Sequence, residues 1–464
     1  MSAPAQAAYV GEPRQLAQSL YELIQLARES IVLQMYLFAA DGHLALLKPG
    51  RAPFPYAQTV ADWLIEKRRR EPHVQVAVVL DTNTPDDPRR VRQPGDLVRH
   101  QLERAGVMVL NANLFHTRYD ARRTLLPGMD FHQRWRQLGP EDWVARQQRW
   151  QSLHNVEDHR KNLVIDQGTW GAVTSHNLFD AAACWHENLL LFDGEPARAL
   201  WRSAREALRL ALELPQRLDA SQRAALHALL SREATASPPY QPLPLAPALE
   251  RYTAPDAPAV PPPTPRPARL RVLDSEAIRP ALETAIDRVP AGGHIAVATT
   301  YFSDLGMLER LLDAARRGVS VRVLVDDTAA LPLPEPTGFL VRQLVNRRVL
   351  EAARRRAPPG FALRIHRSGG GTMMHLKTAA FVGPTSVLIG GQANYTPNSF
   401  NGAWWETDVE VESPELVADF LAHFDALWAL PASVPLRPVT PWARPWAQAC
   451  LGTLALLSRC GLQP

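Results

Sequence analysis

The hydrophobic and polar positions along the chain predict the same order of strands and helices twice. Continuous apolar runs are typical of buried strands, and apolar residues three or four positions apart are typical of amphipathic helices. The elements predicted in the first copy are a strand at 30–38, a helix at 57–70, a strand at 74–81, a helix at 97–106 and a strand at 107–110. Those of the second copy are a strand at 294–302, a helix at 305–318, a strand at 319–327, a helix at 340–356 and a strand at 361–366. This duplication indicates an internal repeat of α/β units.

Each copy also closes with an amphipathic helix, at 197–214 in the first and at 414–430 in the second. Between the copies, a proline-rich segment with little periodicity predicts an extended linker. We therefore expect an α/β fold of two halves, each with a mixed sheet covered by helices. The predicted divisions are a first half at 14–235, a linker at 236–267, a second half at 268–430 and a C-terminal tail at 431–464.

Composition narrows the class of protein. The chain has 464 residues, 46% of them hydrophobic, and its three cysteines form no C-x-x-C pair, so neither a disulfide framework nor a cysteine zinc site is predicted. The first residues lack a basic stretch followed by an apolar core, and no run reaches the roughly 18 apolar residues that span a bilayer. A cytoplasmic protein is expected. The net charge of +4 allows an anionic partner but does not choose among lipid headgroup, nucleic acid and phosphate.

The candidate chemistry lies in two short motifs that occupy equivalent places in the repeat. "HRKNLVID" begins at His159 and "HLKTAAFV" begins at His375, and in each the lysine, Lys161 or Lys377, follows two positions later. Alternate side chains of a strand share one face, so each histidine and its lysine are expected to point together into a site. Two such pairs brought together by a pseudo-twofold would surround a single anion, which suits a phosphodiester.

Each motif is followed by a matching set of polar residues. These are Ser175, Asn177 and Glu187 in the first copy, and Gln392, Asn394, Ser399, Asn401 and Glu406 in the second. Ser399 and Asn401 either line the site near Asn394 or cap a turn, and both interpretations stay open. His154, Asp158 and His159 could suggest a metal site, but no further ligand cluster accompanies them, so neither a metal nor a cofactor is predicted.

The paired motifs resemble those of the phospholipase D superfamily, in which H-x-K-x-x-x-x-D precedes a G-S-x-N-like turn and a later acidic residue. The wording "MMHLKT…IGGQANYTPNSFNGAWWE" is similar in particular to bacterial cardiolipin synthases and related phosphatidyltransferases. Two departures stand out: Val382 occupies the place that Asp166 holds in the first motif, and the "TSHN" turn lacks the first glycine. The resemblance implies two α/β/α halves packed as a pseudo-twofold pair with one shared active site, active as a single chain.

The resemblance also implies a mechanism. One histidine attacks phosphorus to give a phosphohistidine, and the other protonates the leaving alcohol and then deprotonates water or an acceptor alcohol. Our hypothesis makes His159 the nucleophile and His375 the acid/base. Each glutamate is expected to hold the far ring nitrogen of the histidine in its own half and to favour its protonated form. The expected phosphoryl-binding residues are Lys161, Lys377, Asn177 and Asn394, with Asp166, Ser175 and Gln392 in support.

Two segments outside the repeat bear on the substrate. An insertion at 111–156, rich in Arg, Trp and Phe, suits either a lipid surface or stacking on single-stranded nucleic acid. The tail carries Trp442 and Trp446 before an apolar helix too short to span a bilayer. That helix either lies in the membrane surface or packs on the body of the protein. We expect a peripheral protein at the inner face of the cell membrane.

Three functions follow from these patterns. The first is a phosphatidyltransferase or phospholipase that moves a phosphatidyl group to water or a lipid alcohol. The second is a nuclease of the same superfamily, which would need a continuous basic groove that the modest net charge does not demand. The third is a catalytically inactive repeat protein, which is supported only by Val382 and by the altered "TSHN" turn. Salt separates the first two, because affinity for nucleic acid falls steeply with ionic strength.

Overall fold

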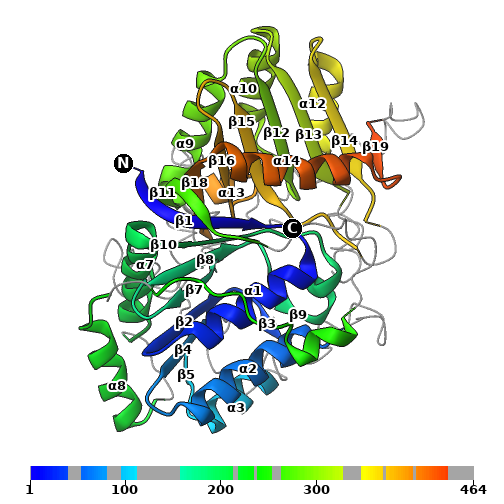
Figure 1. Ribbon diagram of the computed structural model, residues 1–464. Coiled ribbons are helices and arrows are strands. Elements are labelled where there is room, and N and C mark those ends of the chain that lie inside the picture. The colour runs from blue at the N-terminus through cyan, green and yellow to red at the C-terminus, as the bar shows by residue number, and fades with distance from the viewer. Residues whose placement is uncertain are drawn as a thin grey trace, which may run out of the picture.

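The computed structural model shows two α/β halves that share one long sheet (Figure 1). The residues that it describes are 2–39, 54–80, 96–111, 157–212, 218–234, 238–252, 263–327, 346–368, 372–400 and 404–436. The 15-stranded sheet runs in the order β19-β14-β13-β12-β15-β16-β18-β11-β1-β10-β8-β7-β2-β4-β5. Its middle is the antiparallel pair β1–β11, one strand from each half. The predicted fold class, two mixed α/β halves related by a pseudo-twofold, is confirmed.

The pseudo-twofold is visible in the strand pairing outward from this central pair. The strands of the first half are β1 (Ala3–Val10), β10 (Leu189–Asp193), β8 (Trp170–Thr174), β7 (Lys161–Ile165), β2 (Ser30–Met35), β4 (Gln75–Leu80) and β5 (Met108–Asn111). Their counterparts are β11 (Arg266–Asp274), β18 (Thr407–Glu412), β16 (Val387–Gly391), β15 (Lys377–Val382), β12 (His294–Thr299), β13 (Ser320–Asp326) and β14 (Phe361–His366). In both halves the first four pairings are antiparallel and the last two are parallel. β19 (Ser433–Pro435) adds an edge to β14.

The helices follow the same repeat. Those of the first half are α1 (Pro13–Leu26), α2 (Tyr56–Arg70), α3 (Asp96–Arg104), α7 (Gly194–Leu212) and α8 (Ala220–Leu230). Those of the second half are α9 (Ser275–Arg288), α10 (Leu305–Arg316), α12 (Arg347–Arg356), α13 (Pro397–Phe400) and α14 (Pro414–Ala429). The strand and helix positions predicted from periodicity are confirmed within a few residues, except where 340–345 lies outside the described chain.

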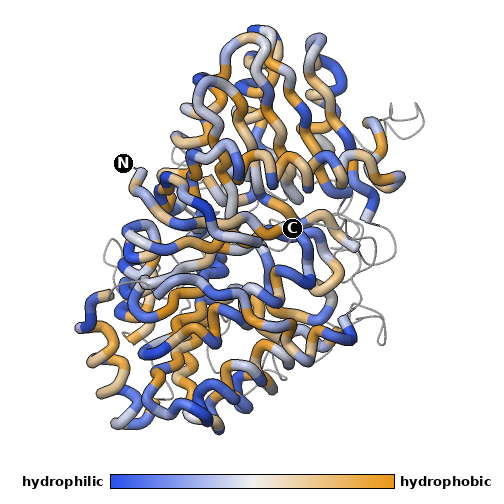
Figure 2. The backbone as a smooth tube through the Cα atoms, in the orientation of Figure 1, coloured by the Kyte–Doolittle hydropathy of each residue, from blue (hydrophilic) through white to orange (hydrophobic). Residues whose placement is uncertain are grey.

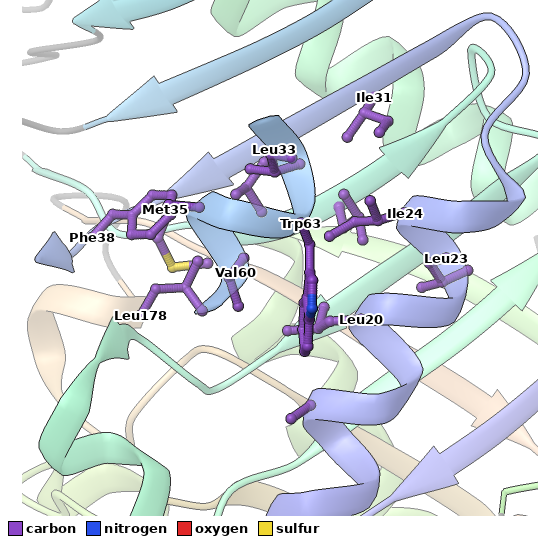
Figure 3. Packing of buried hydrophobic residues seen from close by; sticks show 14 of the residues in the cluster. Leu20, Leu23, Ile24, Ile31, Leu33, Met35, Phe38, Val60, Trp63 and Leu178 are labelled. Carbon is purple, nitrogen blue, oxygen red and sulfur yellow. The ribbon is translucent and has the colours of Figure 1, made fainter. Parts of the chain in front are cut away.

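Two hydrophobic layers cover the sheet of the first half. On one face, α1 and α2 pack on β2, and Figure 3 shows Leu20 and Ile24 of α1 beside Trp63 of α2, below Ile31 and Leu33 of the strand. The other face is covered by α7. Figure 2 shows hydrophobic positions gathered along the strands and alternating with hydrophilic positions along the helices. Burying this apolar surface is the main favourable term for folding.

The two halves share a continuous core. The cluster beneath α7 continues across the central strands to α14, so that Trp201 of α7 and Phe420 of α14 belong to one buried group. α9, α10 and α12 cover the opposite face of the second half with a cluster of their own. Because the core crosses the β1–β11 junction, the halves are held together by packing as well as by strand pairing.

The segment predicted as an extended linker is in part docked on the first half. Its described residues 238–252 include a short 3-10 helix, η3 (Pro247–Arg251). Trp170 Nε1 donates to the carbonyl of Pro238 at 2.9 Å, and Leu249 and Tyr252 are buried in the core under α1. The first half also includes strand β1, which begins before the predicted start at residue 14. Most of the 111–156 insertion and of the tail lies outside the described residues.

Three buried histidines meet where the halves join. His186 of the first half lies edge-on to His366 of the second at 5.5 Å between ring centroids, and Tyr9 Oη lies 2.9 Å from His423 Nδ1. Burial lowers the pKa of His186 to about 3 and that of His423 to about 4. Both rings are therefore neutral in the folded protein near neutral pH.

Acidification is expected to destabilise the fold through these histidines. Below pH 6.5 the unfolded chain binds protons at His186 and His423 that the folded chain does not take up until about pH 4 or lower. The free energy of unfolding should then fall by about 1.4 kcal/mol per pH unit per histidine, or about 2 kcal/mol each between pH 6.5 and 5. Urea unfolding at pH 7 and pH 5 measures this, and His423→Gln should weaken the dependence. Equal stabilities at the two pH values would contradict the account.

Among the described residues, no helix is long and apolar enough to cross a membrane.

Candidate active site

The two H-x-K motifs lie at equivalent places in the sheet. Lys161 is the first residue of β7 and Lys377 is the first residue of β15, and His159 and His375 lie two positions before these strands. Both histidines are buried, as are both lysines. Lys161 Nζ lies 3.2 Å from His159 Nδ1, and Lys377 Nζ lies 2.8 Å from His375 Nδ1. Each histidine and its lysine therefore share one site, as the alternation along the strand predicts.

Short backbone pairings between the halves bring the motifs together. β17 (Trp404–Trp405) pairs in parallel with β6 (Glu157–Asp158), which directly precedes His159. In the other copy, His186 N donates to Met373 O and His375 N donates to His186 O, both at 2.8 Å. In each case the segment just before a glutamate of one half is bonded to the segment just before the histidine of the other half.

The histidine–glutamate pairs consequently cross between the halves. His159 Nδ1 lies 2.9 Å from Glu406 Oε2, and His375 Nδ1 lies 2.7 Å from Glu187 Oε1. The expectation that each glutamate holds the histidine of its own half is wrong. The reason is topological, because the backbone pairings that place each glutamate connect it to the opposite motif. The site is therefore incomplete in either half alone.

The second oxygen of each glutamate is bound by a serine of its own half. Ser175 Oγ donates to Glu187 Oε2, and Ser399 Oγ donates to Glu406 Oε1 at 3.1 Å. Ser175 lies in the turn after β8, whereas Ser399 lies in α13, so the two serines bind equivalent glutamate oxygens from different elements. Of the two interpretations of Ser399, the structure favours a place in the site. Asn401 lies outside the described residues.

Aromatic rings flank both histidines, and we did not predict them. Trp404 stacks on His159 at 4.9 Å between centroids, with Tyr36 at 4.5 Å, and Trp185 lies 5.1 Å from His375. Both tryptophans stand two positions before the glutamate of their copy, so a repeated W-x-E is the signal that could have found them. Tyr36 has no such signal, because Thr300 occupies the corresponding position of the second copy.

The electrostatics of the site keep both histidines neutral. Burial and the charges of Lys161 and Lys377 hold the pKa of His159 and that of His375 well below 6.5. Burial raises the pKa of Glu406 to about 8 and lowers that of Lys377 to about 7. The expectation that the glutamates favour protonated histidines is therefore wrong for the ligand-free site, because desolvation and two lysines outweigh them. A bound anion would offset the lysine charges and raise the histidine pKa values again.

The two asparagines, Asn177 and Asn394, are buried. Asn394 Oδ1 accepts from the backbone N–H of Tyr301 at 3.2 Å, which orients its amide nitrogen as the group left to donate. Gln392 is hydrogen-bonded to both halves. Its Nε2 donates to Asn162 Oδ1 of the first half at 2.7 Å, and its Oε1 accepts from Thr407 N of the second half at 3.0 Å. Gln392 thus ties the first H-x-K strand to the second half.

The glycine missing from the "TSHN" turn has a structural compensation. In the second copy, Gly391 pairs with Asp408, whose Oδ1 accepts from Gln392 N at 2.6 Å, and a Cβ on Gly391 would lie 2.7 Å from that same oxygen. In the first copy, Thr174 pairs with Leu189 and uses its own hydroxyl to accept from His176 N at 3.0 Å. The threonine therefore replaces the glycine–aspartate pair.

Asp166 lies at the far end of its strand from the candidate site. Its carboxylate accepts from the backbone N–H groups of Arg28, Glu29 and Ser30 at 2.7 to 3.1 Å. β7 separates it from Lys161 by about 16 Å at roughly 3.3 Å per residue. The suggestion that Asp166 supports the chemistry is not what the structure shows, since it closes the turn into β2. Val382 in the second copy therefore removes nothing from the site.

Asp158, considered above as a metal ligand, is instead paired with the residue between His159 and Lys161. Arg160 is buried and donates to both oxygens of Asp158 at 2.7 Å, while its guanidinium carbon lies 3.3 Å from the centre of the Trp405 ring. In the part of the chain that the structure describes, no group of three or more His, Cys, Asp or Glu residues could hold a metal ion. His154 lies outside that part.

Comparison with known proteins concerns the second half and the fold. A family model described as "Cardiolipin synthase, PLD-like domain" matches residues 289–428. The fold is similar to the crystal structure of phosphatidylserine synthase from Haemophilus influenzae Rd KW20, with a TM-score of 0.58 and 14% identity over 98% of this chain and 95% of that chain. A weaker similarity is to polyphosphate kinase from Porphyromonas gingivalis, with a TM-score of 0.47 and 10% identity over 98% of this chain and 53% of that chain. Another is to Nuc, a phospholipase D family member from Salmonella typhimurium, with a TM-score of 0.28 and 19% identity over 37% of this chain and 99% of that chain.

No curated protein matches the sequence. The family match covers the second half, and the pseudo-twofold extends the same strand order to the first. The second half thus matches a PLD-like domain over residues 289–428, and the chain as a whole has a fold similar to that of the Haemophilus influenzae phosphatidylserine synthase.

Proposed function

We propose that this protein transfers the phosphatidyl group of a phospholipid to water or to an alcohol through a phosphohistidine. The observation that carries the proposal is the arrangement of two buried H-x-K pairs in one site, each histidine held by the glutamate of the opposite half. Nδ1 of each histidine is engaged by a carboxylate, so Nε2 is assigned as the reacting ring nitrogen. In His375 this nitrogen also lies 2.7 Å from Lys377 Nζ, so the lysine has to turn toward the phosphoryl group for Nε2 to react. Two such imidazoles, each with a lysine beside it, suit in-line displacement at phosphorus.

The reaction proceeds in two half-reactions. In the first, His159 Nε2 forms a bond to phosphorus, the bond from phosphorus to the leaving alcohol breaks, and His375 gives that alcohol its proton. In the second, His375 takes a proton from water or an acceptor alcohol, whose oxygen attacks phosphorus and releases His159. The pKa of His159 lies well below 6.5 in the free site, so its ring is neutral and can act as the nucleophile. The anionic substrate itself raises the pKa of His375, which prepares that histidine to act as the acid.

The lysines and asparagines stabilise the phosphoryl group in this scheme. Lys161 and Lys377 place two ammonium groups beside the histidines, and the amide of Asn394 adds a donor in fixed orientation. Preorganised donors of this kind are worth several kcal/mol where negative charge develops.

A phospholipid substrate is supported by the comparisons. The matched family model is described as that of a cardiolipin synthase, and the protein of similar fold is named a phosphatidylserine synthase. We therefore propose a phosphatidyltransferase of the cardiolipin synthase type that acts as a single chain and needs no cofactor. Peripheral membrane contact at the inner face of the cell membrane stays a prediction, because the tail helix and the insertion lie outside the described residues.

The test is transfer in lipid vesicles. Purified protein is incubated with phosphatidylglycerol vesicles and ethanol, and the lipids are identified by mass spectrometry. Cardiolipin or phosphatidylethanol should form with the wild type and be lost in His375→Ala, while His227→Ala on the exposed face of α8 is the matched control. Unchanged lipids, together with cleavage of single-stranded DNA in the same buffer, would overturn the proposal in favour of a nuclease.

The pH dependence should report Lys377. Its pKa is lowered to about 7 by burial, so the free enzyme loses this positive charge as the pH rises through 7. We expect kcat/KM to fall on the alkaline side from about pH 7, because a neutral lysine no longer attracts the phosphodiester. In Lys377→Arg the side chain stays charged, so the kcat/KM that remains should no longer fall above about pH 7. The same alkaline limb in the wild type and the variant would assign it to another group.

A further inference from the structure

One side of the candidate site carries buried polar atoms without a protein partner. Both ring nitrogens of His176, the hydroxyl of Tyr56 and Nε1 of Trp185 have no hydrogen-bond partner among the described residues. These side chains belong to residues that are only 1%, 1% and 2% exposed. A buried donor or acceptor left unpaired costs about 1–3 kcal/mol, so a cluster of them calls for a ligand.

The three side chains adjoin His375 and its glutamate. The ring of His176 stacks on Tyr56 at 4.5 Å between centroids and an interplanar angle of 20°, and Trp185 lies 5.1 Å from His375. His176 follows Ser175, which binds Glu187, and the Glu187 charge acts on both His176 and Tyr56. The cluster therefore lies on the His375–Glu187 side of the site.

The second half has a different surface at the corresponding positions. The turn residue equivalent to His176 is Ala393, and the first residue of α10, equivalent to Tyr56 at the start of α2, is Leu305. The pseudo-twofold is thus broken at two of the three positions. At the third, Trp404 is the counterpart of Trp185, and its Nε1 likewise has no partner among the described residues. A substrate whose two ends differ in polarity would be oriented by this difference.

We propose that His176, Tyr56 and Trp185 form the alcohol subsite and select an alcohol with more than one hydroxyl group. The inference rests on the proposed function, in which both the leaving and the entering alcohol exchange a proton with His375. Burial lowers the pKa of His176 to about 4, so the ring is neutral and offers one donor and one acceptor. Tyr56 adds a hydroxyl and Trp185 an N–H donor.

These neutral groups suit a polyol better than a charged alcohol. The reacting hydroxyl is handled by His375, so the cluster is left to bind the remaining hydroxyls. A carboxylate or an ammonium on the alcohol would need an opposite charge, which none of the three side chains supplies. The Glu187 carboxylate beside the cluster is already engaged by His375 and Ser175. A simple monohydric alcohol has nothing to pair with the cluster and leaves it unsatisfied.

The experiment is a competition between two acceptors. Vesicles that carry phosphatidyl-p-nitrophenol as donor are incubated with equal concentrations of glycerol and ethanol, and the ratio of phosphatidylglycerol to phosphatidylethanol is measured. The wild type should prefer glycerol. His176→Phe, which keeps a stacked ring, and Tyr56→Phe, which removes one hydroxyl, should each lower the ratio about tenfold.

A control and two distinguishable failures complete the test. Tyr9→Phe removes a buried hydroxyl that contacts His423 instead, and its ratio should equal that of the wild type. If the wild type forms both products and neither Tyr56→Phe nor His176→Phe changes the ratio, the cluster binds only water and the inference is wrong. If the wild type forms neither product, the proposed function itself fails.

Discussion

Replacing His159 by alanine is expected to abolish the covalent intermediate and to lower kcat by about 10⁴-fold or more. His375→Ala should behave differently with phosphatidyl-p-nitrophenol as donor. The p-nitrophenolate leaves without a proton, so the intermediate still forms at His159. Its breakdown is slow, because no base activates the acceptor. The variant should therefore release one equivalent of p-nitrophenolate in a burst and then nearly stop.

Stopped-flow absorbance measures both variants directly. His227→Ala, exposed on α8, serves as the control for loss of a histidine. A burst in His159→Ala together with none in His375→Ala would exchange the two roles. The pseudo-twofold makes this a real alternative, because both histidines are buried and both are backed by a carboxylate.

Replacing the glutamates should show that the halves serve each other. Glu406 lies 2.9 Å from His159 and Glu187 lies 2.7 Å from His375. Glu406→Gln should therefore slow formation of the intermediate, and Glu187→Gln should slow its breakdown, each by about 10²–10³-fold, since the partner carboxylate orients the imidazole and stabilises its cationic form. The measurement is the burst amplitude and rate with the same activated donor.

The crossed pairing makes the outcome specific. If each glutamate served the histidine of its own half, the phenotypes would be exchanged: Glu187→Gln would resemble His159→Ala, and Glu406→Gln would resemble His375→Ala. Ser203→Ala offers a matched control, because Ser203 accepts from Arg160 at 3.1 Å and touches the motif without holding a histidine. Its effect should fall on both steps alike, as expected for a loss of stability.

Much of the fold was predictable because it follows from local patterns. Apolar runs such as "SIVLQM" and "VQVAVVL" are buried strands in any α/β arrangement, and their repetition after residue 290 predicts the second half. What periodicity could not show is that β1 and β11 join the halves into one sheet. That junction depends on pairing between strands more than 250 positions apart, and no local signal encodes it.

The residues of the candidate site were proposed from the sequence, but the contacts between them could not be. The H-x-K motifs and the glutamates were identified from their duplication. Their cross-pairing depends on β6 meeting β17, two-residue strands without a sequence pattern of their own. His176 was quoted in the "TSHN" turn but given no role, because a single histidine beside an asparagine carries no signal until burial and missing partners are known.

The sequence alone also did not show what the departures from the expected motif mean for the site. Val382 and the missing glycine at Thr174 could suggest an inactive second or first copy. The structure gives both an ordinary explanation: Asp166 closes a turn away from the site, and Thr174 caps its own turn where Gly391 relies on Asp408. An inactive repeat protein therefore has no support from these substitutions.

The most direct test of the shared site is to trap the intermediate and locate it. Wild-type protein is mixed with vesicles of phosphatidyl-p-nitrophenol, quenched within the burst and digested under conditions that preserve phosphohistidine, and the peptides are examined by mass spectrometry. The account predicts a phosphatidyl group on the peptide that carries His159 and none on the peptide that carries His375. A label on His375 alone would reverse the mechanism, and turnover without a label on either histidine would contradict covalent catalysis at this site.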